Sequence, residues 1–275
     1  MPIAQSSAAV HCATVLDVTG FPGDITILGF EAPRLVESVK PGQFVMLIPP
    51  HGEVPATALG VYEAQGERAS LMFVACGPRT RELAALRRGA KLDLFGPLGN
   101  GFFMDEAAQR IALVSGGLGL ASLLLPALAA QRCGKDVRLF YGARSADRLV
   151  GGERFVGAGI PVAYATDDGS HGKHGYVSDL LDDPRWHPDM ILACGPTPML
   201  RATARVAERL EIRAQLSLEE NFGCGVGACW GCVVPIDRAS PQAYAYDKAP
   251  GETRDYAFSR VCKEGPVYWA HELRW

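Results

Sequence analysis

Short runs of β-prone hydrophobic residues, separated by glycine and proline, occupy the first hundred residues of the chain. They include ITILGF (25–30), QFVMLIP (43–49), ASLMFVAC (69–76) and KLDLFG (91–96). Several short strands with turn residues between them are typical of a small antiparallel barrel. The pattern therefore predicts an antiparallel β-barrel over residues 1–102.

The pattern changes after this region, because hydrophobic strand-like runs begin to alternate with helical stretches. The strand candidates are RIALVSG (110–116), DVRLFYGAR (136–144), PVAYATDDG (161–169) and MILACGP (190–196), and TPMLRATARVAERL (197–210) has a helical pattern. Such alternation indicates a parallel sheet covered by helices. We expect an α/β nucleotide-binding-type domain over residues 103–212 and a small third domain over residues 213–275.

Residues 111–130 require a membrane check, since these twenty residues contain no charge and could span a bilayer by length. Their order argues for another structure. A β-prone run ending at Val114 meets Gly116, Gly117 and Gly119, and an apolar Ala/Leu-rich stretch follows. This is the order of a strand, a phosphate-binding turn and a helix, so we predict no membrane span. Gly195 and Pro196 stand at the end of the strand candidate 190–196, and parallel sheets bind their ligands at such strand ends.

Composition and charge restrict the function classes. The chain is 48% hydrophobic and 21% charged with a net charge of −3, which is ordinary for a globular protein. This charge gives no electrostatic reason to expect a nucleic acid partner. The start lacks a charged segment followed by an apolar one, as a secretory signal would have, so we expect a cytoplasmic protein.

Three of the eight cysteines lie within the segment NFGCGVGACWGCVV (221–234). Their spacing is Cys224-x4-Cys229-x2-Cys232, and Cys262 follows later as a fourth thiol. This is the plant-type ferredoxin spacing for a [2Fe-2S] cluster held by four thiolates. A zinc site is the alternative, but structural zinc usually takes two short C-x2-C pairs and here there is one. We therefore predict a [2Fe-2S] cluster at these four cysteines.

The motifs together resemble one protein family. They are GPLGNGF (96–102), SGGLGLAS (115–122), ACGPTPML (193–200), SLEENFGCGVGACWGCVV (217–234) and RVCKEGPVY (260–268). In this order they are similar to the electron-transfer subunit of the two-subunit dihydroorotate dehydrogenases, within the ferredoxin-NADP reductase superfamily. The resemblance covers nearly the whole chain.

The resemblance implies an electron relay that carries FAD and a [2Fe-2S] cluster, meets NAD, and docks on a catalytic flavoprotein or other redox subunit. The chain would then be the NAD-linked oxidoreductase subunit of a multi-subunit enzyme. A nicotinamide gives up two electrons as a hydride and a cluster takes one at a time, so a flavin is needed between them. The alternative is a flavin-less subunit that acts as a cluster-only electron wire or a structural adaptor.

The flavin motif departs from the family pattern. The family has an arginine for the FAD pyrophosphate where this chain has Val54, followed by Pro55 and Thr57. A Gly-Thr pair of the family is Arg79 and Thr80 here. Charge-assisted phosphate contacts are strong, so their loss weakens binding. We expect FAD to be retained weakly, with Pro55, Thr57, Arg79 and Thr80 as its binding residues.

Two features concern the nicotinamide nucleotide. Asp147 could accept a hydrogen bond from a ribose 2′-hydroxyl and favour NAD. The nearby Arg144 and Arg148 could instead bind a 2′-phosphate and favour NADP. The family resemblance favours NAD. Cys194 resembles the family cysteine near the nicotinamide, although a cysteine at a strand end can also be simple packing.

Overall fold

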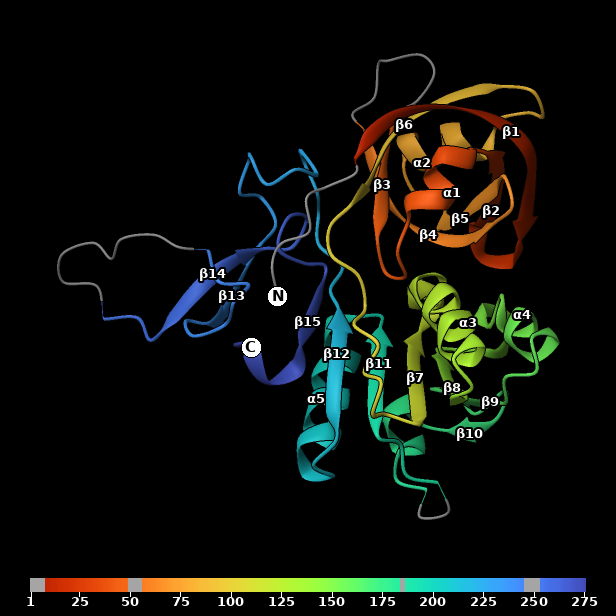
Figure 1. Ribbon diagram of the computed structural model, residues 1–275. Helices are drawn as coiled ribbons and strands as arrows, with labels where there is room; N and C mark the ends of the chain where they lie inside the picture. The colour runs from red at the N-terminus through yellow and green to blue at the C-terminus, as the bar shows by residue number, and fades with distance from the viewer. Residues whose placement is uncertain (1–7, 49–55, 184–185, 245–252) are drawn as a thin grey trace.

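The computed structural model describes residues 8–48, 56–183, 186–244 and 253–275. Figure 1 shows a β-barrel, a parallel-sheet domain below it, and a small C-terminal unit beside both. The predicted order of barrel, α/β domain and cluster-type domain is confirmed. The exact boundaries at residues 102 and 212 stay a prediction.

The barrel is closed and antiparallel, in the strand order β1-β2-β5-β4-β3-β6. Its interior is filled by side chains that are fully buried, including Val15, Leu28, Val45, Leu71 and Leu94. The four predicted runs lie in β2, β3, β5 and β6, while β1 and β4 complete the closure. The elements are β1 (Ala9–Phe21), β2 (Ile25–Glu31), α1 (Pro33–Ser38), β3 (Phe44–Ile48), β4 (Thr57–Gln65), β5 (Arg68–Val74), α2 (Pro78–Ala84) and β6 (Lys91–Leu98).

The second sheet has the strand order β10-β9-β8-β7-β11-β12-β15 and is parallel except at its last pair. The elements are β7 (Arg110–Gly116), η2 (Gly117–Ser122, a 3₁₀ helix), α3 (Leu124–Arg132), β8 (Asp136–Ala143), α4 (Gly152–Gly157), β9 (Val162–Thr166), β10 (Lys173–His174), β11 (Met190–Cys194), α5 (Thr197–Arg209), β12 (Arg213–Ser217) and β15 (Val267–Trp269).

Helices cover both faces of this sheet. Leu113 packs in one hydrophobic cluster with Leu124 and Ala127 of α3, and its neighbour Val114 packs in another with Leu200 of α5. Successive strand residues point to opposite faces, so both sides must be apolar. Residues 111–130 are accordingly a strand, a glycine turn and a helix, as predicted. No helix among the described residues is long and apolar enough to cross a bilayer.

The C-terminal unit is built on a hairpin of β13 (Val233–Asp237) and β14 (Tyr256–Arg260). It shares the large sheet with the preceding domain, because β15 pairs antiparallel with β12. The sheet does not stop at residue 212, since β12 pairs in parallel with β11 beyond that point. The third unit is thus joined to the second by continuous backbone hydrogen bonding.

The segment after β6 joins the barrel to the C-terminal unit through Asn100. Its side-chain amide donates to the carbonyls of Val267 at 2.7 Å and Glu264 at 3.0 Å, and accepts from the Val267 N–H at 2.9 Å. The preceding Gly99 has a φ of +71°, and a Cβ there would lie 2.7 Å from Pro266 Cδ. The barrel exit is therefore held against the segment that carries Cys262.

We predict that Asn100→Ala lowers the free energy of unfolding of the C-terminal unit by about 1–3 kcal/mol, because it leaves the Val267 N–H and two carbonyls without this partner. Urea titration followed by tryptophan fluorescence measures the change. Gln131→Ala, which removes an amide bonded to an Ala158 carbonyl on the exposed surface, is the matched control and should cost less than about 0.5 kcal/mol. Equal midpoints for the two variants would contradict the role assigned to Asn100.

Candidate functional site

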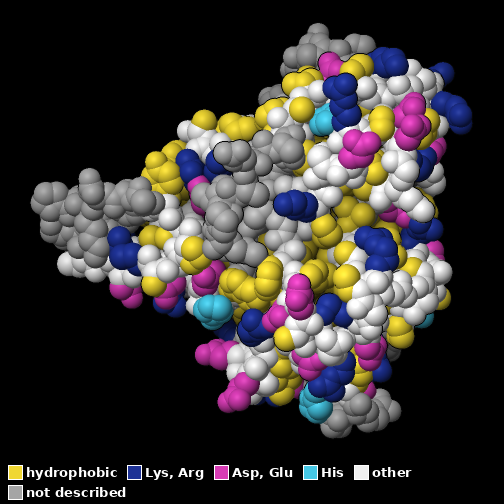
Figure 2. Space-filling view, viewed as in Figure 1, with side chains coloured by type: hydrophobic (Ala, Val, Ile, Leu, Met, Phe, Trp, Pro, Cys, Tyr) yellow, Lys and Arg dark blue, Asp and Glu magenta, His cyan; other side chains and the backbone are white. Residues whose placement is uncertain are grey.

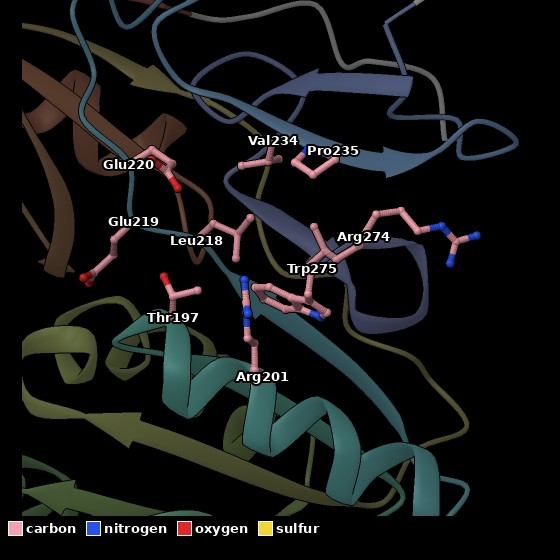
Figure 3. A pocket seen from close by; sticks show the side chains of 10 residues that line it. Thr197, Arg201, Leu218, Glu219, Glu220, Val234, Pro235, Arg274 and Trp275 are labelled. Atoms are coloured by element: carbon pink, nitrogen blue, oxygen red, sulfur yellow. The ribbon is translucent and has the colours of Figure 1, made fainter. Parts of the chain in front are cut away.

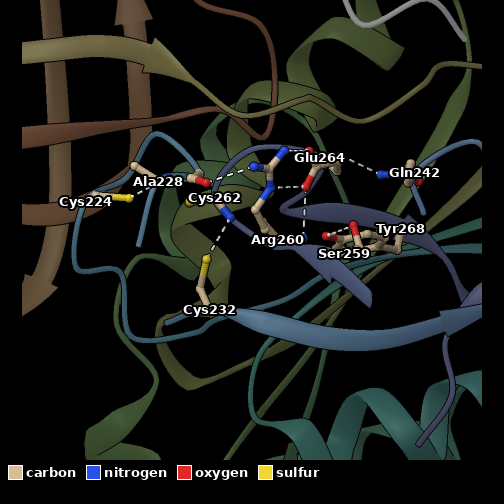
Figure 4. Close-up of polar contacts among 10 residues, drawn as sticks. Cys224, Ala228, Cys232, Gln242, Ser259, Arg260, Cys262, Glu264 and Tyr268 are labelled. Carbon is tan, nitrogen blue, oxygen red and sulfur yellow. Dashed lines mark hydrogen bonds and ion pairs between the residues drawn. The ribbon is translucent and has the colours of Figure 1, made fainter. Parts of the chain in front are cut away.

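The four predicted ligand cysteines lie in two pairs. The N–H groups of Ala228 and Cys229 donate to the Cys224 Sγ atom at 3.2 and 3.4 Å. The Cys262 N–H donates to the Cys232 Sγ atom at 3.4 Å, across the end of the β13–β14 hairpin (Figure 4). Among the described residues no three His, Cys, Asp or Glu side chains converge as ligands of one metal ion. Two pairs suit a two-iron cluster, in which each iron takes two thiolates, better than a single zinc ion.

The loop around Cys224 needs left-handed backbone at three places. Gly225 and Gly227 have φ of +69° and +84°, and Trp230 has φ of +58°. Glycine adopts this conformation without a Cβ clash, which explains two of the glycines in the motif. The turns bring the N–H groups of the loop toward the Cys224 sulfur.

The protonation of these thiols matches a metal-ligand role. Burial alone would raise the pKa of Cys224, but hydrogen bonds from the N–H of Val226 and from Cys229 lower it to about 6. Burial and the hydrogen bond with Cys232 raise the pKa of Cys262 to about 12. The protein thus favours the thiolate form of Cys224, while Cys262 holds a proton that a bound metal would displace. The donor set fits a [2Fe-2S] cluster.

The predicted nucleotide residues gather at the carboxyl edge of the large sheet. Cys194 of β11 is in register with Ser115 of β7. A Cβ on Gly119 would lie 2.1 Å from the Cys194 carbonyl oxygen, and one on Gly116 would lie 2.8 Å from Pro196 Cδ. Both glycines are required by this close packing.

Gly117 is different, because its φ is +53° and no atom lies within 4 Å of its Cβ position. The open space beside this turn leaves room for a phosphate to approach the backbone. The turn between β7 and η2 and the Cys194–Pro196 turn are thus brought together, as the sequence predicts.

Cys194 is fully buried and its Sγ atom lies 3.7 Å from Glu219 Oε1. Burial, and then the nearby Glu219 charge, raise the thiol pKa far above its ordinary value. Loss of surrounding water also raises the pKa of Glu219, although this residue keeps an exposed surface. The two therefore place a buried thiol beside a carboxyl of raised pKa at the strand ends. Glu219 was missed by the sequence analysis, although an acidic residue two positions after the strand Arg213–Ser217 was a usable signal.

Asp147 lies on the surface after β8, the strand next to β7, and does not touch the Cys194 group. Its carboxylate accepts from Ser145 Oγ at 2.5 Å and lies 3.7 Å from Arg148 Nε. Arg148 also reaches the Gly23 carbonyl of the barrel at 3.5 Å. The residue predicted to bind the ribose and the competing cation are therefore adjacent on one loop.

The flavin residues are only partly brought together. The Thr57 hydroxyl oxygen is buried and has no hydrogen-bond partner among the described residues. Arg79 donates to the Ala56 carbonyl at 3.2 Å, so it lies beside the end of β4. Thr80 instead bonds the Gly77 N–H at 3.1 Å and caps α2. Val54 and Pro55 lie outside the described residues. The unpaired, buried Thr57 hydroxyl and the nearby Arg79 are suited to binding a flavin.

Neighbouring strands of the barrel contact the other two units at paired positions. Gly60 of β4 pairs with Phe44 of β3. A Cβ on Gly60 would lie 3.1 Å from Ser122 Oγ of η2, and the Phe44 ring lies 4.9 Å from that of Phe222. A Cβ on Gly225 would meet Met46 Sδ at 2.5 Å. Figure 2 shows hydrophobic side chains along the junction of the barrel and the sheet domain.

A separate pocket of about 160 Å³ lies between α5, the end of β12 and the C-terminus. Arg201 stacks on the Trp275 ring at 5.3 Å within it (Figure 3). Glu219, the neighbour of Cys194, also lines this pocket, whereas none of the flavin or nucleotide residues predicted from the sequence does. We assign it no role in the predicted chemistry.

Comparison with known proteins gives concordant results. Residues 219–274 match the iron-sulfur cluster binding domain of dihydroorotate dehydrogenase B. The chain is 31% identical to the dihydroorotate dehydrogenase B (NAD(+)) electron transfer subunit of Caldanaerobacter subterraneus, over 85% of this chain and 86% of that protein. It is 36% identical to the subunit of the same description from Bacillus caldolyticus, over 87% and 89%.

The fold is also similar to solved structures. A chain of the NADH-dependent reduced ferredoxin-NADP oxidoreductase superposes with a TM-score of 0.81 at 24% identity, covering 96% of this chain and 90% of that chain. The ferredoxin reductase of carbazole 1,9a-dioxygenase superposes with a TM-score of 0.63 at 23% identity, over 74% and 67%. At these identities the likeness concerns the fold alone.

We predict that anaerobically purified chain contains about two iron and two acid-labile sulfide ions, as four thiolates in two pairs imply. Cys229→Ser should abolish the electron paramagnetic resonance signal of the reduced cluster, because one iron loses a ligand. Cys133→Ser, at an exposed cysteine far along the sequence from the loop, should leave signal and iron content unchanged. Stoichiometric zinc without sulfide would contradict the assignment.

Proposed function

The chain belongs to the family of electron transfer subunits of dihydroorotate dehydrogenase B, and we propose that it relays electrons between NAD(H), a flavin and a [2Fe-2S] cluster to or from a separate catalytic redox subunit. The single observation that carries this proposal is the pairing of Phe44 with Gly60 on neighbouring barrel strands. Phe44 contacts Phe222, which precedes the cluster loop, and Gly60 lies against Ser122, which follows the nucleotide turn. A flavin held at this wall lies between its two redox partners.

We propose that Thr57, Arg79 and Thr80, with Pro55, hold FAD. Thr57 supplies an unpaired buried hydroxyl, which requires a partner for its cost of burial to be offset. Arg79 supplies a cation next to Thr57, because it donates to the carbonyl of the preceding residue, Ala56. Thr80 acts by fixing the start of α2, since its hydroxyl is occupied by the Gly77 N–H.

We propose that Gly116, Gly117 and Gly119 admit the pyrophosphate of NAD, and that Gly195, Pro196 and Cys194 border its nicotinamide. Glu219 lies against the same thiol. Burial raises the pKa of both side chains, and the nearby Glu219 raises that of Cys194 further. The buried Cys194 thiol helps to exclude water from the ring. Asp147 is assigned to the ribose.

We propose that Cys224, Cys229, Cys232 and Cys262 are the cluster ligands. When bound, the flavin accepts a hydride as two electrons and the cluster carries them one at a time. The chain itself supplies binding, orientation and exclusion of water, and none of its groups is required as an acid or base on a final substrate. It is the NAD-linked oxidoreductase subunit of a larger enzyme.

The partner is proposed to dock near the cluster loop. Val226 and Trp230 are both about 40% exposed there, and a cluster must lie near its acceptor to exchange electrons. A cytoplasmic location is also proposed, because all eight cysteines are free thiols in the structure and a reducing compartment maintains that state.

We predict that NADH reduces the chain with a lower KM than NADPH, and that Asp147→Ala raises the KM for NADH about two- to tenfold by removing one hydrogen bond to the ribose. Steady-state reduction of ferricyanide measures both. Asp182→Ala removes a surface carboxylate paired with Arg209 and should leave the KM unchanged. Preference for NADPH, with its KM raised by Arg148→Ala, would instead assign the loop to a 2′-phosphate.

We predict that FAD is bound but partly lost during purification, since Val54 removes a charged hydrogen bond worth about 1.5–3 kcal/mol, or about ten- to more than a hundredfold in affinity. Val54→Arg should raise the flavin content, measured by absorbance against protein. Val10→Arg, at an exposed position of β1, controls for added charge. A chain that takes up no FAD at high micromolar concentration would support the flavin-less electron wire.

A further inference from the structure

Arg260 is the last residue of β14 and makes contacts with both parts of the cluster site. Its Nη1 donates to the Gly227 carbonyl at 2.8 Å. Its Nε donates to Glu264 Oε2 at 3.0 Å, and Nη2 pairs with Glu264 Oε1 (Figure 4). The carboxylate therefore occupies one edge of the guanidinium, and the Cys224 loop occupies the other nitrogen.

The Gly227–Ala228 peptide links this cation to a ligand sulfur. Its carbonyl accepts from Arg260, and its N–H donates to the Cys224 Sγ atom at 3.2 Å. The C=O and N–H of a trans peptide point in opposite directions, so one planar group spans the gap. Hydrogen bonds in series polarise one another, and the Arg260 charge strengthens the N–H donated to the sulfur.

Surrounding groups hold the guanidinium in place and limit its contact with water. Its carbon Cζ lies 4.4 Å from the Tyr244 ring centroid and 5.4 Å from that of Trp230. The side chains of Arg260 and Glu264 are only 15% and 7% exposed. Glu264 Oε2 also accepts the Arg260 backbone N–H at 2.9 Å, which anchors the carboxylate. Charges in such surroundings act more strongly than on an open surface.

We propose that Arg260 and Glu264 set the reduction potential of the cluster, Arg260 raising it and Glu264 opposing it, and that Arg260 acts through the Gly227–Ala228 peptide. This inference rests on the proposed function, since it requires a [2Fe-2S] cluster at the four cysteines. Neither residue is a ligand. Arg260 is a positioning residue that also supplies charge.

The direction of each effect follows from charge. Reduction adds one electron, so the reduced cluster is more negative and a nearby cation favours it. A nearby carboxylate disfavours it. Hydrogen bonds to cluster sulfurs and local charge are recognised means by which a protein changes this potential. Removing the two side chains singly should therefore move the potential in opposite directions, which loss of packing alone would not do.

The test is a redox titration of the full chain with dithionite and mediators, in which the reduced cluster is followed by electron paramagnetic resonance. Arg260→Gln should shift the midpoint potential to more negative values, and Glu264→Gln should shift it to more positive values. The double variant should lie between them. Arg260→Lys keeps the charge without the forked pairing and should lie closer to wild type than Arg260→Gln.

Arg274→Gln is the matched control, because Arg274 forms an ion pair with Asp237 at the opposite end of β13 from Cys232. Asp237 lies about 16 Å along the strand from Cys232. Removing the Arg274 charge there should leave the potential unchanged. Unchanged potentials in both single variants at the Arg260–Glu264 pair, or shifts of the same sign, would overturn the inference.

Iron and sulfide content, measured in every sample, separates the possible failures. A wild-type chain without iron and sulfide would refute the proposed function itself. A loaded wild type with unmoved variants would refute only the role of Arg260 and Glu264. If Arg260→Gln does not retain its cluster, the required positive shift in Glu264→Gln decides, and its absence overturns the inference.

Discussion

The hydrogen bonds of the Asn100 amide are the constraint that holds the end of the barrel against the C-terminal unit. Asn100 follows the barrel, yet it bonds the carbonyls of Glu264 and Val267 around the segment that carries Cys262. The Gln242 side chain donates to the same two carbonyls, at 2.6 and 2.9 Å. Two amides from different units therefore satisfy one stretch of backbone. An electron relay needs such rigidity, because its cofactors must keep their separation while the chain meets other molecules.

One wall of the barrel contacts both of the other units. Strand β3 receives the cluster loop at Met46 and Phe44, while β4 beside it receives the glycine turn at Gly60. A Cβ at Gly225 would lie 2.5 Å from Met46 Sδ and one at Gly60 would lie 3.1 Å from Ser122 Oγ, so glycine allows the close approach of the neighbouring unit at both positions. A single pair of barrel strands thus brings the electron source and the cluster to the same place.

Local features of the fold were predictable from residue patterns. The cysteine spacing indicated four candidate ligands, and the glycines after Val114 indicated a nucleotide-binding turn, because both patterns rest mainly on residues close together in the chain. Strands β1 and β4 were not among the predicted runs, since their identity depends on closing a barrel with distant partners. The place of strand β12 in the large sheet was not visible in the local pattern for the same reason, because it follows from the pairing with β11.

The sequence by itself determined the order of the three units and the family to which the chain is related, and it indicated the four cysteines proposed as ligands. The tertiary structure alone decided which cysteines pair, that Glu219 faces Cys194, that the Thr57 hydroxyl is left without a partner, and that Arg260 connects Gly227 to Glu264. Gly227 and Arg260 are far apart along the chain, and no spacing rule relates them. Their contact arises because the β13–β14 hairpin folds back onto the cluster loop, and long-range contacts of this kind follow from packing rather than from any local pattern.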